Sequence, residues 1–190
     1  TQVKKIAVVG AGPAGLAFAT TAAKRGHQVT LFDAANTIGG QFNIAKLIPG
    51  KEEFYETIRF FNRQLELGTV DLKLGQYADL ALLKSGQFDE VVLATGVTPR
   101  HLNIEGADSP KVMNYLDVLR DKKPVGKRVA VIGAGGIGFD VSEFLTHIGE
   151  SPTLNSKKFF AEWGIDTSYA HRGGITTPAP EASPREVYLL

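Results

Sequence analysis

The feature that most constrains this chain is a short apolar run that leads directly into a glycine-rich turn, because the combination occurs twice. The first run, Lys5–Val9, is followed by Gly10–Gly15 in the pattern G-x-G-x-x-G. The second run, Arg128–Ile132, is followed by Gly133–Gly138 in the same pattern. A short apolar run bounded by a glycine turn predicts a buried strand of a parallel sheet. The repeat, roughly 120 residues apart, is too long for a solenoid and predicts two copies of one supersecondary unit.

The first turn has the residue types that bring a pyrophosphate to the start of a helix. Gly10 permits the tight turn, Gly12 lets the backbone approach the phosphates, and Gly15 lets the helix pack closely on the strand. Pro13 suits the first helical turn, where its missing N–H costs nothing, and Ala14 follows it. Free N–H groups and the helix dipole attract the phosphates. The fold class is therefore predicted to be α/β, with Rossmann-like dinucleotide-binding units.

An acidic residue stands where such a unit binds the ribose. Leu16–Lys24 is rich in alanine and predicts a helix, and Val29–Phe32 predicts the next strand, with Asp33 at its carboxyl end. An acid at this position accepts hydrogen bonds from the ribose hydroxyls of a dinucleotide. The alternative is a solvated acid at a strand end. The complete order of strand, turn, helix, strand and acid favours ribose binding.

The second turn has its strand and helix, but no acid or base is visible after its second strand. Arg185–Leu190 predicts that strand, and the residue that distinguishes NAD from NADP follows it in such folds. We therefore expect a chain cut from a longer protein at both ends, since Thr1 also replaces an initiator Met. Asp140, just inside the second helix, either suits the helix dipole or lies near a flavin–nicotinamide contact. The candidate cofactor contacts are Gly133, Gly135, Gly136, Ile137 and Gly138.

The remaining chain predicts a division into two domains, residues 1–105 and 111–190. Helices are expected over 51–67, 115–122 and 139–148, and strands over 70–74 and 90–96, whereas 78–84 is ambiguous. Residues 34–50 are expected to form a loop. Residues 150–184 are polar and rich in Gly, Pro and Ser, which predicts a long, poorly anchored insertion in the second domain. Lys46 is either a surface lysine or a residue that reaches a flavin, and Trp163 is expected to pin the insertion.

Composition excludes several classes of protein. Hydrophobic residues make up 43% of the 190 residues and charged residues 22%, which is typical of a globular protein rather than a disordered one. The net charge of +1 gives no reason to expect a nucleic acid or an anionic membrane as a partner. The absence of cysteine excludes disulfides, thiolate nucleophiles and Cys-ligated clusters from this stretch, and it fits a cytoplasmic protein. The histidines have no metal-ligand spacing, so no metal site is expected.

Several motifs occur in a recognisable order along the chain. They are Gly10–Leu16, Asp33, Ile38–Phe42, Ile48–Phe54, Ala94–Gly96 with Pro99 and Arg100, Tyr115–Leu119, Gly133–Asp140 and Glu162–Asp166. Together they resemble the NADPH-dependent 2,4-dienoyl-CoA reductases of bacteria, close relatives of the trimethylamine dehydrogenases. The resemblance covers essentially the whole chain. It implies a role in fatty acid β-oxidation and an NADH:flavin oxidoreductase relationship.

The resemblance implies a much larger protein. An amino-terminal (β/α) barrel of the same polypeptide would carry FMN and the substrate site, followed by an iron–sulfur cluster. Hydride would pass from NADPH to FAD, and electrons would continue through the cluster to FMN; NADH is not excluded by the residues present. By matching positions, the FAD contacts would be Gly10, Gly12, Pro13, Ala14, Gly15, Asp33, Gly40, Gln41, Phe42, Thr95 and Gly96, with Ala78 or its neighbour Tyr77 at the adenine.

Three functions remain open at this point. The chain is an electron-entry module of a reductase, a relative that holds ADP or FAD structurally without nicotinamide turnover, or an isolated nucleotide-binding module. The complete triplet Gly133, Gly135 and Gly138 favours the first. By itself, the 190-residue chain is expected to have no NAD(P)H-dependent reductase activity.

Overall fold

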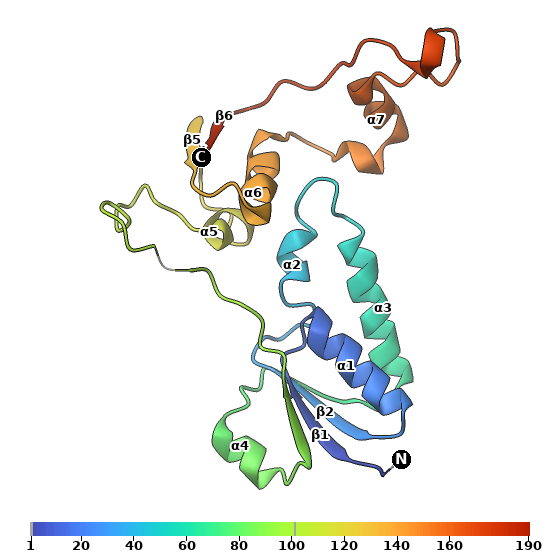
Figure 1. Ribbon diagram of the computed structural model, residues 1–190, viewed down its shortest axis with the longest axis vertical. Coiled ribbons are helices and arrows are strands. Elements are labelled where there is room, and N and C mark those ends of the chain that lie inside the picture. Colours follow the sequence, from blue (N-terminus) through green and yellow to red (C-terminus); the bar gives the residue numbers. More distant parts are fainter. Residues whose placement is uncertain (1, 101) are drawn as a thin grey trace. The chain divides into compact units, whose positions relative to one another are not determined.

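The structure, a computed structural model, describes residues 2–100 and 102–190, which fall into two compact units (Figure 1). The first unit comprises Thr1–Lys46 and Glu53–Thr98, and the second comprises Leu47–Glu52 and Pro99–Leu190. One of the histidines judged unsuited to metal binding, His101, lies outside the described residues, as does Thr1. Both fall within the expected domain 1–105.

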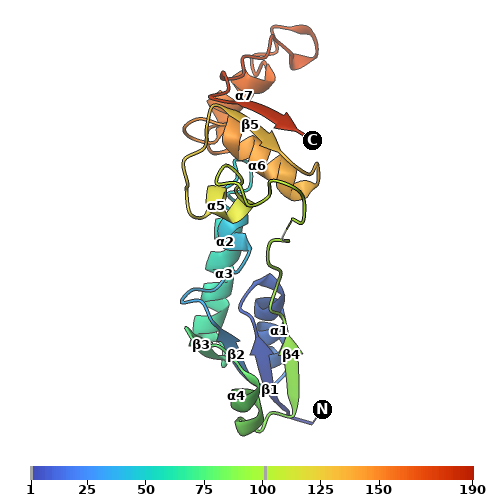
Figure 2. The ribbon, with the colours of Figure 1, turned by 90° about the vertical axis from the view of Figure 1, so that its left-hand side faces the viewer.

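The first unit is built on a four-stranded parallel sheet with the strand order β3-β2-β1-β4 (Figure 2). The strands are β1 (Lys5–Val9), β2 (Gln28–Asp33), β3 (Asp71–Leu74) and β4 (Glu90–Leu93). In the register, Val8 lies beside Leu31 of β2 on one side and Val92 of β4 on the other. The carboxyl ends of β1, β2 and β4 therefore meet at one edge, where the first glycine turn also lies.

Two helices cover the core of this sheet. Helix α1 (Pro13–Lys24) follows the first turn, and α3 (Phe54–Leu67) packs against the same core. Leu16 of α1 is fully buried together with Val8 and Leu31 of the sheet. Each buried side chain of this size contributes about 1.5–3 kcal/mol relative to exposure. The core thus fixes α1 against β1, and the turn between them is held at both ends.

Two expectations for the first unit need correction, and one ambiguous stretch is resolved. The helix expected over 51–67 begins at Phe54, because Lys51 and Glu52 make contacts in the second unit instead. The expected loop 34–50 contains a short helix, α2 (Phe42–Ala45). The ambiguous stretch forms helix α4 (Leu80–Ser85), whose first turn is capped by the Asp79 carboxylate at 2.8 Å from the Leu82 N–H.

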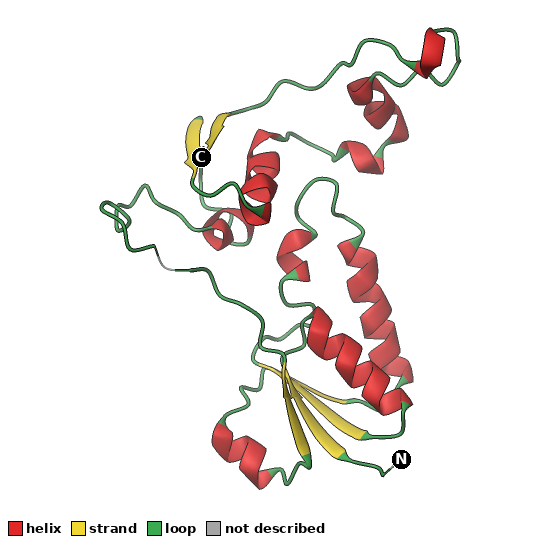
Figure 3. Ribbon diagram, in the orientation of Figure 1, coloured by secondary structure: helices red, strands yellow, loops and turns green. Residues whose placement is uncertain are grey.

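The second unit repeats the strand–turn–helix–strand order in a smaller form (Figure 3). Strands β5 (Arg128–Val131) and β6 (Glu186–Leu189) pair in parallel, and α6 (Gly136–Thr146) connects from the second turn. Helix α6 starts three residues before the expected Phe139 and ends before Ile148. Helix α5 (Tyr115–Leu119) also ends early, because Lys122 has a positive φ of 54° that no helix accommodates.

The insertion at 150–184 contains local structure that its composition did not predict, whereas its weak anchoring stays a prediction. It contains the 3-10 turn η1 (Pro152–Leu154), helix α7 (Ser156–Trp163) and a second 3-10 turn, η2 (Arg172–Gly174). Asn155 caps α7 at its start, and Gly164 ends it in the left-handed conformation. After α7, Ile165 and Ile175 form an isolated antiparallel bridge.

One carboxylate organises the loop closed by this bridge. Asp166 accepts hydrogen bonds from the N–H and hydroxyl of Ser168, at 2.9 and 2.5 Å, and from the N–H of His171 at 2.9 Å. Its Oδ2 also lies 2.9 Å from Nδ1 of His171. The hydrogen bond from the Ser168 hydroxyl, followed by those from His171, holds the pKa of the Asp166 carboxyl well below its usual range.

Candidate functional site

The first glycine turn joins β1 to α1 so tightly that two of its positions exclude any side chain. Gly10 has a φ of +108°, and a Cβ there would lie 2.2 Å from the carbonyl oxygen of Ala94. A Cβ on Gly15 would lie 1.8 Å from the carbonyl oxygen of Gly10. Both distances are far inside van der Waals contact. These two glycines are therefore required by the packing of turn, helix and β4.

The glycine between them is different. Gly12 is the N-cap of α1 with extended backbone, and Pro13 occupies the first turn. A Cβ on Gly12 would come no closer than 3.9 Å to the Cα of Gly40, which is ordinary contact. Protein packing therefore does not require glycine here, whereas a ligand that approaches the backbone would. No described side chain caps α1, so its first turn, with Ala14, suits an anionic group.

The acid at the end of β2 is fixed beside this turn. The Oδ2 atom of Asp33 accepts a hydrogen bond from the Ala11 N–H at 2.6 Å, and Oδ1 accepts one from the Ala35 N–H at 2.8 Å. A carboxylate can accept about four hydrogen bonds, so each oxygen of Asp33 can accept one more from a hydroxyl. The half-buried Asp33 is thus oriented before any ligand binds, with capacity left for a ribose.

The loop after β2 comes back to the same turn. The Gly39 N–H donates to the Ala11 carbonyl at 2.8 Å, and a Cβ on Gly40 would lie 3.0 Å from the Cα of Gly12. Gln41 donates from Nε2 to the Val97 carbonyl at 3.1 Å, just beyond Thr95 and Gly96. The structure therefore brings together the predicted contacts from 10–15, 33, 40–41 and 95–96.

The remaining first-unit candidates lie around this group. The ring of Phe42 packs on Phe54 with centroids 4.3 Å apart, so this side chain is held in an aromatic pair. Ala78 and the exposed Tyr77 follow Gln76, whose N–H donates to the Asp33 carbonyl at 2.9 Å. The chain segment predicted to edge the adenine therefore starts next to the ribose-binding candidate.

Lys46 and Trp163 have local partners. The Lys46 ammonium lies 3.0 Å from Oδ1 of Asn43 and 4.7 Å from the centroid of the Tyr55 ring. The Trp163 ring lies 6.1 Å from that of Phe159 within α7, and 64% of Trp163 is exposed. Lys46 is thus held by neighbours in its own unit. Trp163 packs on another residue of α7, and most of the Trp163 side chain is exposed.

The second turn repeats the local geometry of the first. Gly133 has a φ of +110°, Gly135 is an extended N-cap, and a Cβ on Gly138 would lie 1.8 Å from the Gly133 carbonyl oxygen. No described side chain caps α6, whose first residues are Gly136 and Ile137. The Gly133 N–H donates to the Leu190 carbonyl at 2.8 Å, as the Gly10 N–H does to Phe32. By this register, Leu190 corresponds to Phe32.

Sequence reasoning missed a polar cluster close to the second turn. Lys51 contacts both carboxylate oxygens of Asp140, at 2.6 and 2.7 Å. Glu52 accepts a hydrogen bond from the Thr153 hydroxyl at 2.7 Å. Partial burial opposes ionisation of Glu52, but hydrogen bonds from Ser151 and Thr153 outweigh it and lower its pKa. The paired residues are 89 and 101 positions apart, and no local pattern announces such pairs.

A model of the pyridine nucleotide-disulphide oxidoreductase family matches residues 4–160. The chain belongs to this family. It is 36% identical over 148 residues to a bilirubin reductase of Mediterraneibacter gnavus, covering 78% of this chain and 23% of that protein. It is 37% identical over 158 residues to a cinnamate reductase of Clostridium sporogenes, covering 80% and 23%. The chain thus spans about a quarter of the length of these curated relatives.

Solved structures have the same fold. The 2-naphthoyl-CoA reductase in complex with 2-naphthoyl-CoA superposes with a TM-score of 0.73 and 27% identity, covering 100% of this chain and 33% of that one. Mycobacterium tuberculosis FprA in complex with NADPH superposes with a TM-score of 0.63 at 23% identity, over 76% and 37%, and supports the fold alone. The predicted α/β fold of an FAD/NAD(P)-binding flavoprotein is confirmed.

The family also establishes the general chemistry. Its members here are oxidoreductases, including reductases and an NADH oxidase of Thermoanaerobacter brockii, so flavin and nicotinamide are the cofactors that the family implies. The geometry of the first turn fits a flavin dinucleotide, since packing does not require glycine at position 12 and Asp33 is already oriented beside the turn. Along residues 2–100 and 102–190, no helix is long and apolar enough to span a membrane.

Proposed function

We propose that this chain is the FAD- and NAD(P)H-binding electron-entry module of a multi-cofactor oxidoreductase that resembles 2,4-dienoyl-CoA reductase. The observation that carries the proposal is the presence of two glycine turns with the same local geometry in one chain. One turn is complete with an oriented acid and suits a tightly held flavin dinucleotide. A second dinucleotide turn in the same chain suits the nicotinamide donor that reduces it.

In the proposed reaction, residues 133–138 would hold NADPH or NADH, which would supply a hydride to an FAD held by the first turn and Asp33. An amino-terminal barrel of the same polypeptide, with an iron–sulfur cluster and FMN, would receive the electrons. Two observations support a larger partner region. The curated relatives are about four times longer than the matched part, and the 2-naphthoyl-CoA reductase contains a counterpart of the whole chain within a third of its own length.

We assign domains and cofactor contacts to this module as the sequence predicts them. Residues 1–105 would form the FAD domain, and 111–190 would form part of the NAD(P)H domain, with the insertion at 150–184. The FAD contacts would come from the first turn, Asp33, the 40–42 loop, Ala78, Thr95 and Gly96. The NAD(P)H contacts would come from Gly133, Gly135, Gly136, Ile137 and Gly138. A cytoplasmic location would suit the β-oxidation role.

A second candidate function is a module that holds ADP or FAD structurally without nicotinamide turnover. The observation that favours it is the open surrounding of the second turn: a Cβ on Gly133 would meet no described atom within 4 Å, in contrast to Gly10. For the same reason, we expect the 190 residues alone not to oxidise NAD(P)H, even with FAD added.

The experiment that separates the two functions uses the intact protein. Its flavin content is measured by absorbance after denaturation and chromatography, which distinguishes FAD from FMN. Binding of NADPH and NADH is then titrated in the wild type and in Gly138→Val, whose side chain would displace the second turn. The proposal expects FAD at one equivalent and nicotinamide binding that Gly138→Val abolishes. FAD without any nicotinamide binding would favour the structural role.

A further inference from the structure

A six-residue segment leaves the first unit to join the second. Leu47–Glu52, hereafter the docking segment, lies between α2 and α3 in sequence, yet its contacts assign it to the second unit. Ile48 is 2% exposed, so its side chain is part of the packed interior. The Gly50 N–H donates to the hydroxyl of Ser151, a buried residue, at 3.3 Å, and Glu52 binds Thr153. The docking segment is thus fixed by specific polar contacts.

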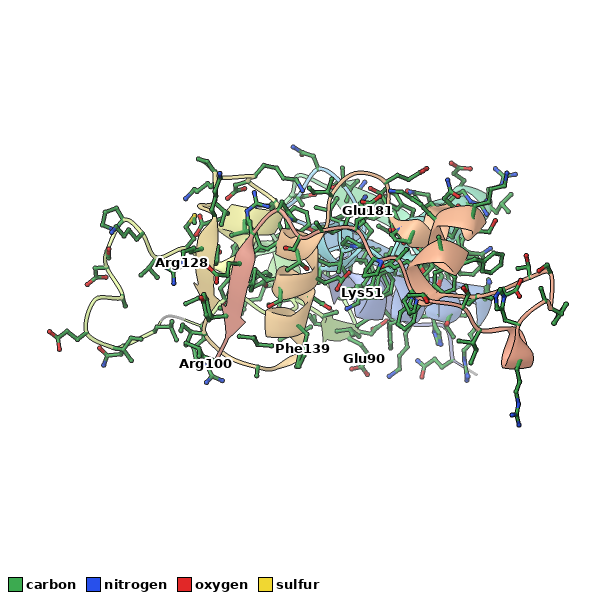
Figure 4. The ribbon with its side chains drawn as sticks, turned by 90° about the horizontal axis from the view of Figure 1, so that it is seen from above. Lys51, Glu90, Arg100, Arg128, Phe139 and Glu181 are labelled. Carbon is green, nitrogen blue, oxygen red and sulfur yellow. The ribbon has the colours of Figure 1, made fainter. Side chains whose placement is uncertain are left out.

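The strongest of these contacts is an ion pair close to the second glycine turn. The Lys51 ammonium spans both oxygens of the Asp140 carboxylate at 2.6 and 2.7 Å. Lys51 is labelled in Figure 4. The two side chains are 40% and 27% exposed, so the pair is partly desolvated. Asp140 is the fifth residue of α6, which begins at Gly136. Four residues of helix rise about 6 Å, so this carboxylate lies about one turn from the uncapped start of α6.

An unpaired carboxylate at that place opposes the binding of a diphosphate. The dinucleotide brings two negative charges to the helix start, where the dipole attracts them. Asp140 lies beyond the first turn, where the dipole's benefit to its own charge has largely faded. By Coulomb's law with a surface-like dielectric constant, its repulsion corresponds to a loss of about three- to thirty-fold in affinity. A cation bound to both oxygens cancels most of that field.

We propose that Lys51 is a positioning residue for the nicotinamide dinucleotide, which acts by neutralising Asp140 at the start of α6. The inference rests on the proposed function, in which the second turn binds NAD(P)H. The proposal adds to the nicotinamide site a cation, Lys51, that lies outside the glycine motif. It also gives the docking segment a role beyond packing: a loop that follows the flavin-side residues 40–42 in sequence sets the charge of the nicotinamide-side helix.

The test compares variants of the two partners of the ion pair. If Lys51 acts by neutralising Asp140, the loss of either partner changes nicotinamide affinity differently, whereas if the pair only anchors the docking segment, both losses weaken binding. Lys51→Met, Asp140→Asn and the double variant are made in the intact, FAD-loaded protein, and dissociation constants for NADPH and NADH are measured at low and high salt. Lys51→Met should weaken binding about three- to thirty-fold, and the defect should shrink at high salt. Asp140→Asn should bind no more weakly than the wild type. The double variant should return to within about three-fold of the wild type, since neither charge remains.

Lys157→Met serves as the matched control, because it removes an exposed lysine from α7 in the same unit and should leave affinity unchanged. If Lys51 only anchors the docking segment, Asp140→Asn will weaken binding as much as Lys51→Met, independently of salt, and the inference is overturned. Wild-type affinity in Lys51→Met also overturns it while leaving the proposed function intact. If the wild type binds neither NADPH nor NADH, the proposed function fails, and this inference fails with it.

Discussion

The two glycine turns of this chain are alike in their backbone and unlike in their surroundings. Gly10 and Gly133 have φ values of +108° and +110°, and Gly15 and Gly138 approach them equally closely. The first turn, however, is flanked by β4 and bonded to Asp33, whereas among the described residues the second is flanked by β5 and β6. The difference shows that the six residues of the turn determine its backbone shape, while the completed site depends on strands and an acid that lie elsewhere in the chain.

The largest expected effect comes from separating packing from ligand contact within the first turn. Gly15→Val should destabilise the first unit by about 3 kcal/mol or more, because its Cβ has no room beside the Gly10 carbonyl. Gly12→Ala should fold with near wild-type stability and yet lose FAD, because only a ligand needs that space. Thermal unfolding and flavin content together measure both. Retention of FAD by Gly12→Ala would show that the phosphates do not approach this glycine.

The acid tests how far preorganisation contributes to the first site. Asp33→Ala in the intact protein should weaken FAD binding markedly, by about 1–3 kcal/mol, because it removes both the ribose acceptor and the bond that holds the Ala11 N–H. Asp33→Asn keeps one acceptor oxygen, so its FAD affinity should fall between those of Asp33→Ala and the wild type. Equilibrium dialysis of released flavin provides the measurement. Unchanged flavin content in Asp33→Ala would remove Asp33 from the site.

A paired substitution measures the difference in surroundings directly. Gly133→Ala should lower the free energy of unfolding by about 1–2 kcal/mol, because residues with a side chain rarely adopt this positive φ. The added Cβ itself would meet no described atom within 4 Å. Gly10→Ala has the same strain and also a Cβ 2.2 Å from the Ala94 carbonyl oxygen, so it should cost distinctly more. Urea unfolding of the two variants gives the comparison. Equal losses of unfolding free energy in the two variants would mean that the neighbouring strands do not affect the tolerance of the turns to a side chain.

The smallest expected effect concerns the insertion. The pKa of Asp166 is depressed in the folded protein, so its hydrogen bonds contribute stability that is present above the ordinary value of 3.8 and lost as pH falls through the lower folded value. Amide exchange at Ser168 and His171 should therefore speed up, relative to distant amides, only under strongly acidic conditions. Asp166→Asn should show fast exchange at every pH. Equal protection in the variant and the wild type would assign the order of this loop to other contacts.

The sequence predicted the turns well because glycine geometry is a local property. It predicted the start of α3 poorly, because Lys51 and Glu52 form their contacts with residues far away in the chain. Helix α7 was hidden by the polar, Gly- and Pro-rich composition of the insertion, although Asn155 and Gly164 mark its two ends. The Lys51–Asp140 pair could not be predicted from the sequence, because the two residues are 89 positions apart and each alone is typical of a surface charge.

The most direct measurement is anaerobic stopped-flow mixing of the intact, FAD-loaded protein with NADPH or NADH while flavin absorbance is followed. If the first turn holds FAD and the second delivers the nicotinamide, one of the two donors bleaches the flavin band in a saturable fast phase. Gly138→Val would then lose this phase without losing FAD. A flavin that stays oxidised with both donors, in a protein whose FAD content is complete, would contradict the electron-entry role.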